Sequence, residues 1–61
     1  MKGFIKVIDI NDKEHFLNID YIIKFTPTGQ AHRGNAIVTT VSETIQTTTT
    51  VDEIVDMIKL Q

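Results

Sequence analysis

The sequence of 61 residues contains no cysteine, no tryptophan, one proline and three glycines. Without cysteine the chain can form neither disulfide bonds nor thiolate metal sites, and two histidines argue against a structural zinc site. A chain of this length buries only about 60% of the surface that its unfolded form exposes. Such small domains usually need a disulfide, a metal or a partner subunit for stability. We therefore expect a homo-oligomer, with a dimer favoured.

The chain also lacks a large excess of either charge and lacks long apolar runs. The formal net charge is −2, and a mildly acidic chain lacks the basic footprint of a general nucleic-acid binder. No apolar run approaches the roughly 18 residues of a membrane span. Residues 1–4 lead directly into strand-like sequence, without the apolar region and cleavage site of a signal peptide. We expect a cytoplasmic protein that does not insert into membranes.

Two strands joined by a turn open the chain. Residues 4–10 predict a strand that is largely apolar on both faces, which is typical of a strand covered on both sides. Asn11, Asp12 and Lys13 supply turn residues, and residues 14–17 predict the second strand of an antiparallel hairpin.

The densest apolar run, residues 16–25, is interrupted at its centre by Asn18 and Asp20. We interpret this run as the part of the core around which the rest packs. Asn and Asp side chains bond readily to nearby backbone, so the two residues predict a sharp corner before a strand over 21–26. Pro27 lacks a donor and should end that strand.

The second half of the chain predicts two more strands and a helix. Gly29 and Gly34 bracket a long loop, and strands over 36–41 and 44–48 are joined by a tight turn at 42–43. Thr50 and Glu53 have the spacing of a capping box at the start of a helix. One face of this helix is an apolar stripe, formed by Val51, Ile54, Val55 and Ile58. Met57 and Leu60 flank the stripe.

These elements predict an α+β fold in a single domain spanning residues 1–61. We expect a small, strongly bent antiparallel sheet of four or five strands with one amphipathic C-terminal helix. One short helix covers only one face of such a sheet. The other face is buried either by a barrel-like curl of the strands or by a second copy, and the small size favours the second copy.

Several residues match a known family in order and spacing: Asn11, then Phe16, Asn18, Asp20 and Ile22, then Pro27 and Thr28, then Glu53, Ile54 and Ile58. On these residues the chain resembles the FlbD-like small proteins of bacterial flagellar operons, also called swarming motility proteins. It departs from their pattern at the turn after Asn11, in the loop 29–35 and at residues 42–43. The resemblance implies a cytoplasmic protein that supports motility, with no assigned catalysis.

Candidate sites are few. His32 and Arg33 in the glycine-bracketed loop could contact an anion or a partner, although an ordinary solvated loop is the simpler interpretation. His15 has no nucleophile nearby in sequence and is interpreted as a partly exposed strand residue. Asn18 and Asp20 offer too few oxygens for calcium and are expected to cap the corner. The acidic residues of the helix are interpreted as a solvated face.

The aromatic residues alternate with lysines near the start of the chain, a pattern that suits stacking on nucleobases but is better explained by core packing. The sequence therefore predicts a non-enzymatic interaction protein that self-associates and docks a protein partner, with no catalytic residues, metal or cofactor. His32, Arg33, Lys6 and Lys24 are the candidate contact residues. The alternative is a small β-barrel that binds nucleic acid through Lys6, Lys24 and Arg33.

Overall fold

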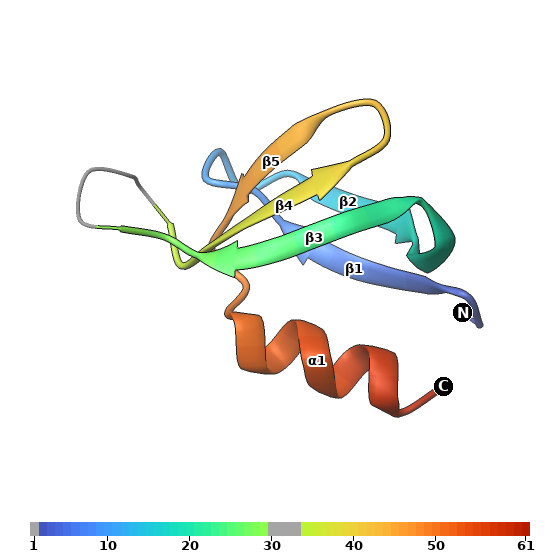
Figure 1. The fold of residues 1–61 in the computed structure, drawn as a ribbon. Helices are drawn as coiled ribbons and strands as arrows, with labels where there is room; N and C mark the ends of the chain where they lie inside the picture. The colour runs from blue at the N-terminus through green and yellow to red at the C-terminus, as the bar shows by residue number, and fades with distance from the viewer. Residues whose placement is uncertain (1, 30–33) are drawn as a thin grey trace.

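The computed structural model describes residues 2–29 and 34–61. Two antiparallel sheets and one C-terminal helix make an α+β fold (Figure 1), as the sequence predicts. The first sheet holds β1 and β2, and the second has the order β3-β4-β5. In chain order the elements are β1 (Phe4–Ile8), β2 (Glu14–Asn18), a short 3-10 helix η1 (Ile19–Tyr21), β3 (Ile22–Pro27), β4 (Ala36–Thr40), β5 (Thr44–Thr47) and α1 (Val51–Lys59).

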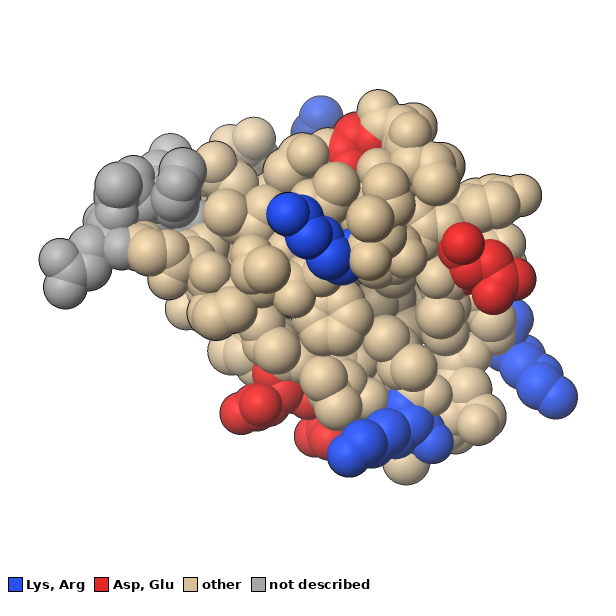
Figure 2. Space-filling view, viewed as in Figure 1, with Lys and Arg blue, Asp and Glu red and all other residues tan. Residues whose placement is uncertain are grey.

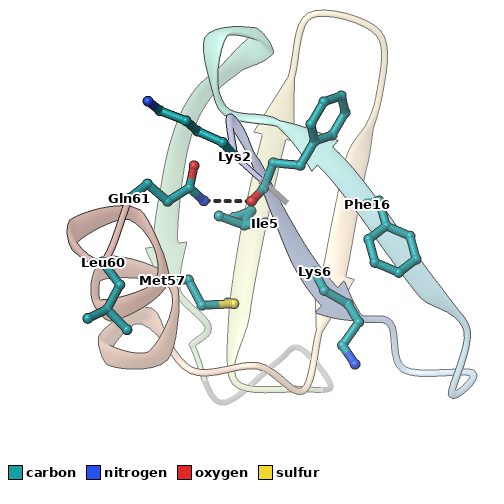
Figure 3. Close-up of a pocket in the computed structure, with 8 residues that line it drawn as sticks. Lys2, Ile5, Lys6, Phe16, Met57, Leu60 and Gln61 are labelled. Carbon is teal, nitrogen blue, oxygen red and sulfur yellow. Dashed lines mark hydrogen bonds between the residues drawn. The ribbon is translucent and has the colours of Figure 1, made fainter.

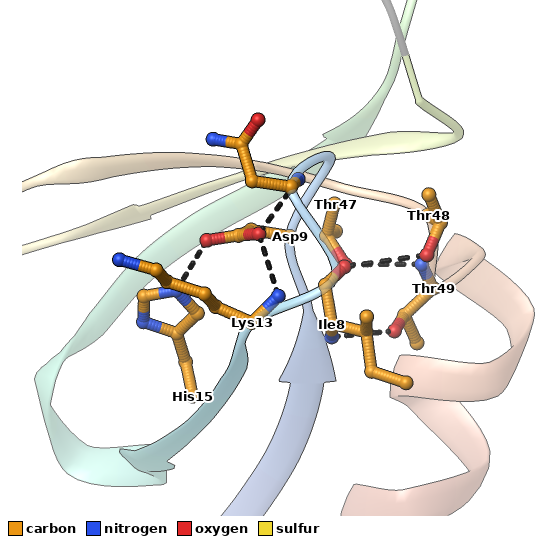
Figure 4. Close-up of polar contacts among 8 residues, drawn as sticks. Ile8, Asp9, Lys13, His15, Thr47, Thr48 and Thr49 are labelled. Carbon is orange, nitrogen blue, oxygen red and sulfur yellow. Dashed lines mark hydrogen bonds and ion pairs between the residues drawn. The ribbon is translucent and has the colours of Figure 1, made fainter.

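The two sheets meet just after β1. Asp9 forms an isolated antiparallel bridge with Thr47, and the Ile8 carbonyl accepts hydrogen bonds from the Thr48 amide at 2.9 Å and the Thr47 hydroxyl at 2.5 Å. Figure 4 shows these bonds converging on Ile8. The threonine run after β5 thus holds the first sheet to the second. Across the described residues, the strands do not close into a barrel.

The core lies between β1, β4 and α1. Its fully or almost fully buried residues are Ile5, Val7, Ala36, Val38 and Ile54. Figure 1 shows α1 running beneath the strands, beside β3 and β1, and α1 packs against both. Ile5 and Val7 share one face of β1 because strand side chains alternate, and that face points at the helix.

The apolar run 16–25 is not the centre of the core, so that interpretation was wrong. Phe16, Tyr21 and Ile23 are 55%, 59% and 64% exposed. Alternation along β2 packs Leu17 against the core and turns Phe16 outward. The expectation that the aromatic residues serve core packing fails for Phe16 and Tyr21 and holds for Phe25, which packs against the core from β3.

The turns follow the local chemistry of the sequence. The Asn18 side chain accepts from the Asp20 amide at 2.9 Å and caps η1, which confirms the corner-capping role predicted for it. β1 ends at Ile8 rather than residue 10, because the Asp9 carboxylate accepts from the amides of Asn11 and Lys13 and starts the turn early.

The start of α1 is as predicted, whereas the role expected of Leu60 is not. The Thr50 hydroxyl accepts from the Glu53 amide at 3.1 Å, and the Glu53 carboxylate accepts from the Thr50 amide at 2.9 Å. Ile54 is fully buried, and Met57 packs against the core. Leu60 was expected to widen this apolar face, but it lies just beyond the helix and is 86% exposed.

Candidate interaction surface

An open groove of about 570 Å³ runs along the outer side of β1 (Figure 3), and we call it the β1 groove. The tail of α1 forms one wall and β2 forms the other. Its lining is mainly apolar side chains with two lysines and one amide: Lys2, Phe4, Ile5, Lys6, Phe16, Met57, Leu60 and Gln61.

The strand register explains the β2 side of the β1 groove. Lys6 and Phe16 are directly paired across the β1–β2 ladder, so both side chains stand on the same face of the hairpin. That face is opposite to the one carrying Ile5 and Val7, which point into the core. A strand that is apolar on both faces, as predicted for β1, therefore has only one face buried.

The helix side of the β1 groove comes from residues at the end of α1. Figure 3 shows Met57 extending from the helix toward β1, with Leu60 on the helix behind it and Phe16 on β2 at the opposite side. Sequence reasoning missed this wall, because Leu60 was expected to flank the apolar stripe and widen the face that packs on the sheet. A usable signal was present: Leu60 falls outside the stripe that Ile54 and Ile58 define.

Gln61 closes one end of the β1 groove with its side-chain amide. Its Nε2 donates to the Phe4 carbonyl at 2.6 Å, and its Oε1 accepts from the Gly3 amide at 2.5 Å. A primary amide offers one donor group and one acceptor, so the side chain pairs with the β1 backbone as a neighbouring strand would. Figure 1 accordingly shows both chain ends on the same side of the molecule.

Charges at the rim are basic, with one acidic neighbour. Lys2 and Lys6 line the β1 groove, and the Lys6 ammonium lies 3.6 Å from the Glu14 carboxylate. Both side chains of this pair are about half exposed, and ion pairs so exposed contribute roughly 0–1 kcal/mol. The Lys6–Glu14 pair therefore adds little to the stability of the fold.

A second polar cluster surrounds Asp9 at the hairpin turn (Figure 4). Its Oδ2 lies 2.8 Å from His15 Nε2. The hydrogen bond from His15 and those from the Lys13 and Asn11 amides hold the pKa of Asp9 below its usual value. Sequence reasoning missed this pair because Asp9 was placed inside a longer first strand. These hydrogen bonds stabilise the turn between β1 and β2.

The other predicted contact residues are distributed differently. Lys24 is exposed on β3, in the second sheet, and does not line the β1 groove. His32 and Arg33 lie outside the described residues. Figure 2 shows acidic and basic side chains interspersed on one face, where the coloured residues form no continuous basic patch. Across residues 2–29 and 34–61 no trio of His, Asp or Glu side chains converges as metal ligands.

The described part of the chain contains no helix of the length and apolarity needed to span a bilayer. Comparison with known proteins found no match to a protein-family model, a curated protein or a solved structure.

Proposed function

We propose that this chain is a small non-enzymatic interaction protein of the cytoplasm, which self-associates and docks a protein partner in the β1 groove. The observation that carries the proposal is the exposure of large apolar side chains on both walls of that groove. Phe16 and Leu60 are more than half exposed, and they belong to different elements that the fold brings to one face.

The composition of the β1 groove supports a macromolecular partner. The cores of protein interfaces are enriched in aromatic residues and methionine, and their rims are polar. Phe4, Phe16 and Met57 supply the first kind of surface, and Lys2 and Lys6 supply the second. An open groove between a helix end and a strand suits a peptide segment, whereas small-molecule sites enclose most of their ligand.

A role in motility is the part of the proposal that rests on the resemblance to FlbD-like proteins. The residues behind that resemblance are mainly turn, capping and core residues, such as Asn18, Thr28 and Ile54. They support a common fold more directly than a common partner. The identity of a captured partner would decide this part.

Site-specific photo-crosslinking in cells tests the docking part. A photoreactive residue at position 60 should form an adduct with a discrete protein, because Leu60 lies in the β1 groove. The matched control is position 52, since Asp52 is also exposed on α1 but does not line the groove. An adduct that forms from position 60 and not from position 52 supports docking, and equal labelling at both positions overturns it.

Binding to nucleic acid, the alternative predicted from the sequence, is tested by salt titration against single-stranded oligonucleotides. Proteins that bind through phosphate contacts lose affinity steeply as salt rises. Affinity tighter than about micromolar at ~0.15 M salt, with such a slope, would replace protein docking by nucleic-acid binding. We expect weaker binding, because the rim of the β1 groove holds only two lysines.

A further inference from the structure

We propose that β2 of one molecule pairs edge to edge with β2 of a second copy, antiparallel, about a two-fold axis at Phe16. The inference rests on the self-association in the proposed function and assigns it a surface and a register. Its starting point is the direction in which the β2 backbone presents its hydrogen-bonding groups.

The β1–β2 ladder fixes that direction. Opposite residues in an antiparallel pair alternate between exchanging hydrogen bonds and pointing their amide and carbonyl groups away. The Asp9 amide donates to the Lys13 carbonyl, and the Ile19 amide donates to the Gly3 carbonyl. In the observed register, the bonded pairs are therefore those with odd residue numbers. The even residues of β2, Glu14, Phe16 and Asn18, turn their backbone groups outward.

The even residues of β1 behave as this alternation requires. The Ile8 carbonyl accepts from the Thr48 amide, and the Phe4 carbonyl accepts from Gln61. The outer edge of β1 is thus covered at both ends by later parts of the same chain. Within the described residues no strand pairs with the equivalent edge of β2.

The other sheet edges are protected. β3 has a register irregularity between Ile22 and Lys24, an exposed lysine, and Pro27 at its end, and bulges, lysines and prolines all discourage edge-to-edge pairing. β5 is bridged to the first sheet through Thr47 and Asp9. β2 has neither a proline nor a lysine, and its ladder with β1 is regular. It also carries an exposed aromatic residue at its centre.

Symmetry and charge then select the register. A two-fold axis at Phe16 aligns all five residues of β2, with Phe16 opposite Phe16 of the second copy. Aromatic pairs in this position stabilise a sheet. Glu14 then faces Asn18 of the second copy, whereas an axis at Glu14 would oppose two carboxylates, which is destabilising. An axis at His15, between these two positions, aligns fewer residues of β2 than an axis at Phe16.

The product is a four-stranded sheet with the order β1-β2-β2-β1. Its outer face carries the two Phe16 rings at the centre, with Lys6 of each copy beside them, since Lys6 pairs with Phe16 across the ladder. The two β1 grooves therefore lie side by side on one surface. A dimer of this kind presents two docking sites to the same partner or to two partners.

Disulfide trapping tests the register directly, because the natural chain has no cysteine. In Phe16→Cys the two Cα atoms would be about 5.5 Å apart, within the range that a disulfide spans. In the matched control Glu14→Cys they would be four residues out of register, ~13 Å apart, which is too far. Under mild oxidation we expect Phe16→Cys to give at least roughly tenfold more disulfide-linked dimer.

Analytical ultracentrifugation separates failure of this inference from failure of the proposed function. The natural chain should be dimeric, Phe16→Lys monomeric and folded by circular dichroism, and Tyr21→Lys dimeric, since Tyr21 is equally exposed but outside β2. A monomeric natural chain overturns the self-association itself. A dimeric natural chain in which Phe16→Lys stays dimeric, or positions 14 and 16 crosslink equally, overturns only the β2 pairing.

Discussion

At the scale of single residues, Gly34 shows how closely the start of β4 approaches its neighbours. Its φ of +88° lies in the left-handed region, which only glycine adopts without steric cost. A Cβ atom at this position would lie 2.7 Å from the Thr47 carbonyl oxygen and 3.1 Å from a methyl group of Ile10. The loop must therefore enter β4 through a residue without a side chain.

Gly34→Ala should destabilise the protein by clearly more than Gly3→Ala. Gly3 also has a positive φ, of +84°, but nothing lies within 4 Å of its added Cβ. Each variant bears a conformational cost of about 1–2 kcal/mol, and only Gly34→Ala adds a clash with backbone. Urea denaturation measures the difference in the free energy of unfolding. Equal losses would mean that the close approach at Gly34 relaxes freely.

A second residue-scale prediction concerns pH. The pKa values of Asp9 and Glu53 are lowered in the folded protein, for Asp9 mainly by the His15 hydrogen bond and for Glu53 mainly by the Thr50 amide. A carboxyl group with a lowered pKa stabilises the fold above its unfolded pKa, about 4 for these residues. That stabilisation is lost as the pH falls through the lower folded value.

Thermal unfolding followed from pH 7 down to about pH 3 should therefore show a falling midpoint below pH ~4–5. Asp9→Asn should be less stable than the natural chain near neutrality and should lose less of its stability on acidification. Asp20→Asn is the control, because Asp20 is an exposed carboxylate in η1, away from this turn. If Asp9→Asn and Asp20→Asn gave the same pH profile, the Asp9 cluster would have no role in acid sensitivity.

At the scale of elements, α1 depends on its capping box and on one fully buried side chain. The reciprocal bonds between Thr50 and Glu53 satisfy two amides that have no partner within the helix. Thr50→Ala should lower the free energy of unfolding by about 0.5–2 kcal/mol. Thr50→Ser should retain most of the stabilisation by the cap, because serine also has a hydroxyl group. Chemical denaturation checks this, and an unchanged Thr50→Ala would place the helix start elsewhere.

Ile54 and Leu60 make a matched pair on the same element. Ile54 is fully buried between α1 and the strands, whereas Leu60 is exposed at the wall of the β1 groove. Ile54→Asp buries a carboxylate without a partner and should unfold the chain. Leu60→Asp should leave the circular dichroism and melting temperature nearly unchanged, because Leu60 is largely exposed. A folded Ile54→Asp would remove α1 from the core.

At the scale of the whole molecule, the chain is small and exposes several large apolar side chains: Phe16, Tyr21, Ile23, Val41 and Leu60. They come from the two sheets, the connecting turns and the end of α1. A monomer of this size has little stability to spare. The proposed pairing of β2 between two copies would place the two Phe16 rings side by side, an apolar contact that the single chain cannot make.

Stability should therefore depend on protein concentration. For a dimer whose interface forms only in the folded state, mass action raises the melting temperature as the concentration increases. The natural chain should show this rise in calorimetry over a hundredfold range of concentration, roughly micromolar upward. Phe16→Lys should melt at one temperature throughout. A natural chain with a constant midpoint would contradict the dependence on a second copy.

Local features were the ones that the sequence predicted well. The hairpin turn after β1, the Asn18 cap of η1, the end of β3 at Pro27 and the Thr50 cap all depend on residues within four positions of each other. Strand ends were less accurate. β1 stops at Ile8 because the carboxylate of Asp9 bonds to its own turn, and propensity alone does not reveal that competition.

The candidate site was predicted only in part. Lys6 does line the β1 groove, but Lys24 lies in the other sheet. Met57, Leu60 and Gln61 were not foreseen as groove residues, because their position depends on how α1 lies against β1. That placement is determined by contacts between residues more than fifty positions apart, such as Gln61 and Phe4.

The sequence by itself determined the class of the fold, because strand alternation, turn residues and caps act between near neighbours, and its lack of cysteine excluded disulfides. Only the tertiary structure decided which apolar side chains are inside. The run 16–25 and the strand 4–10 are similarly apolar, yet β1 contributes two core residues and Phe16 faces solvent. Burial depends on which surfaces other elements cover: α1 packs against β1, and within the described residues no strand pairs with the outer edge of β2.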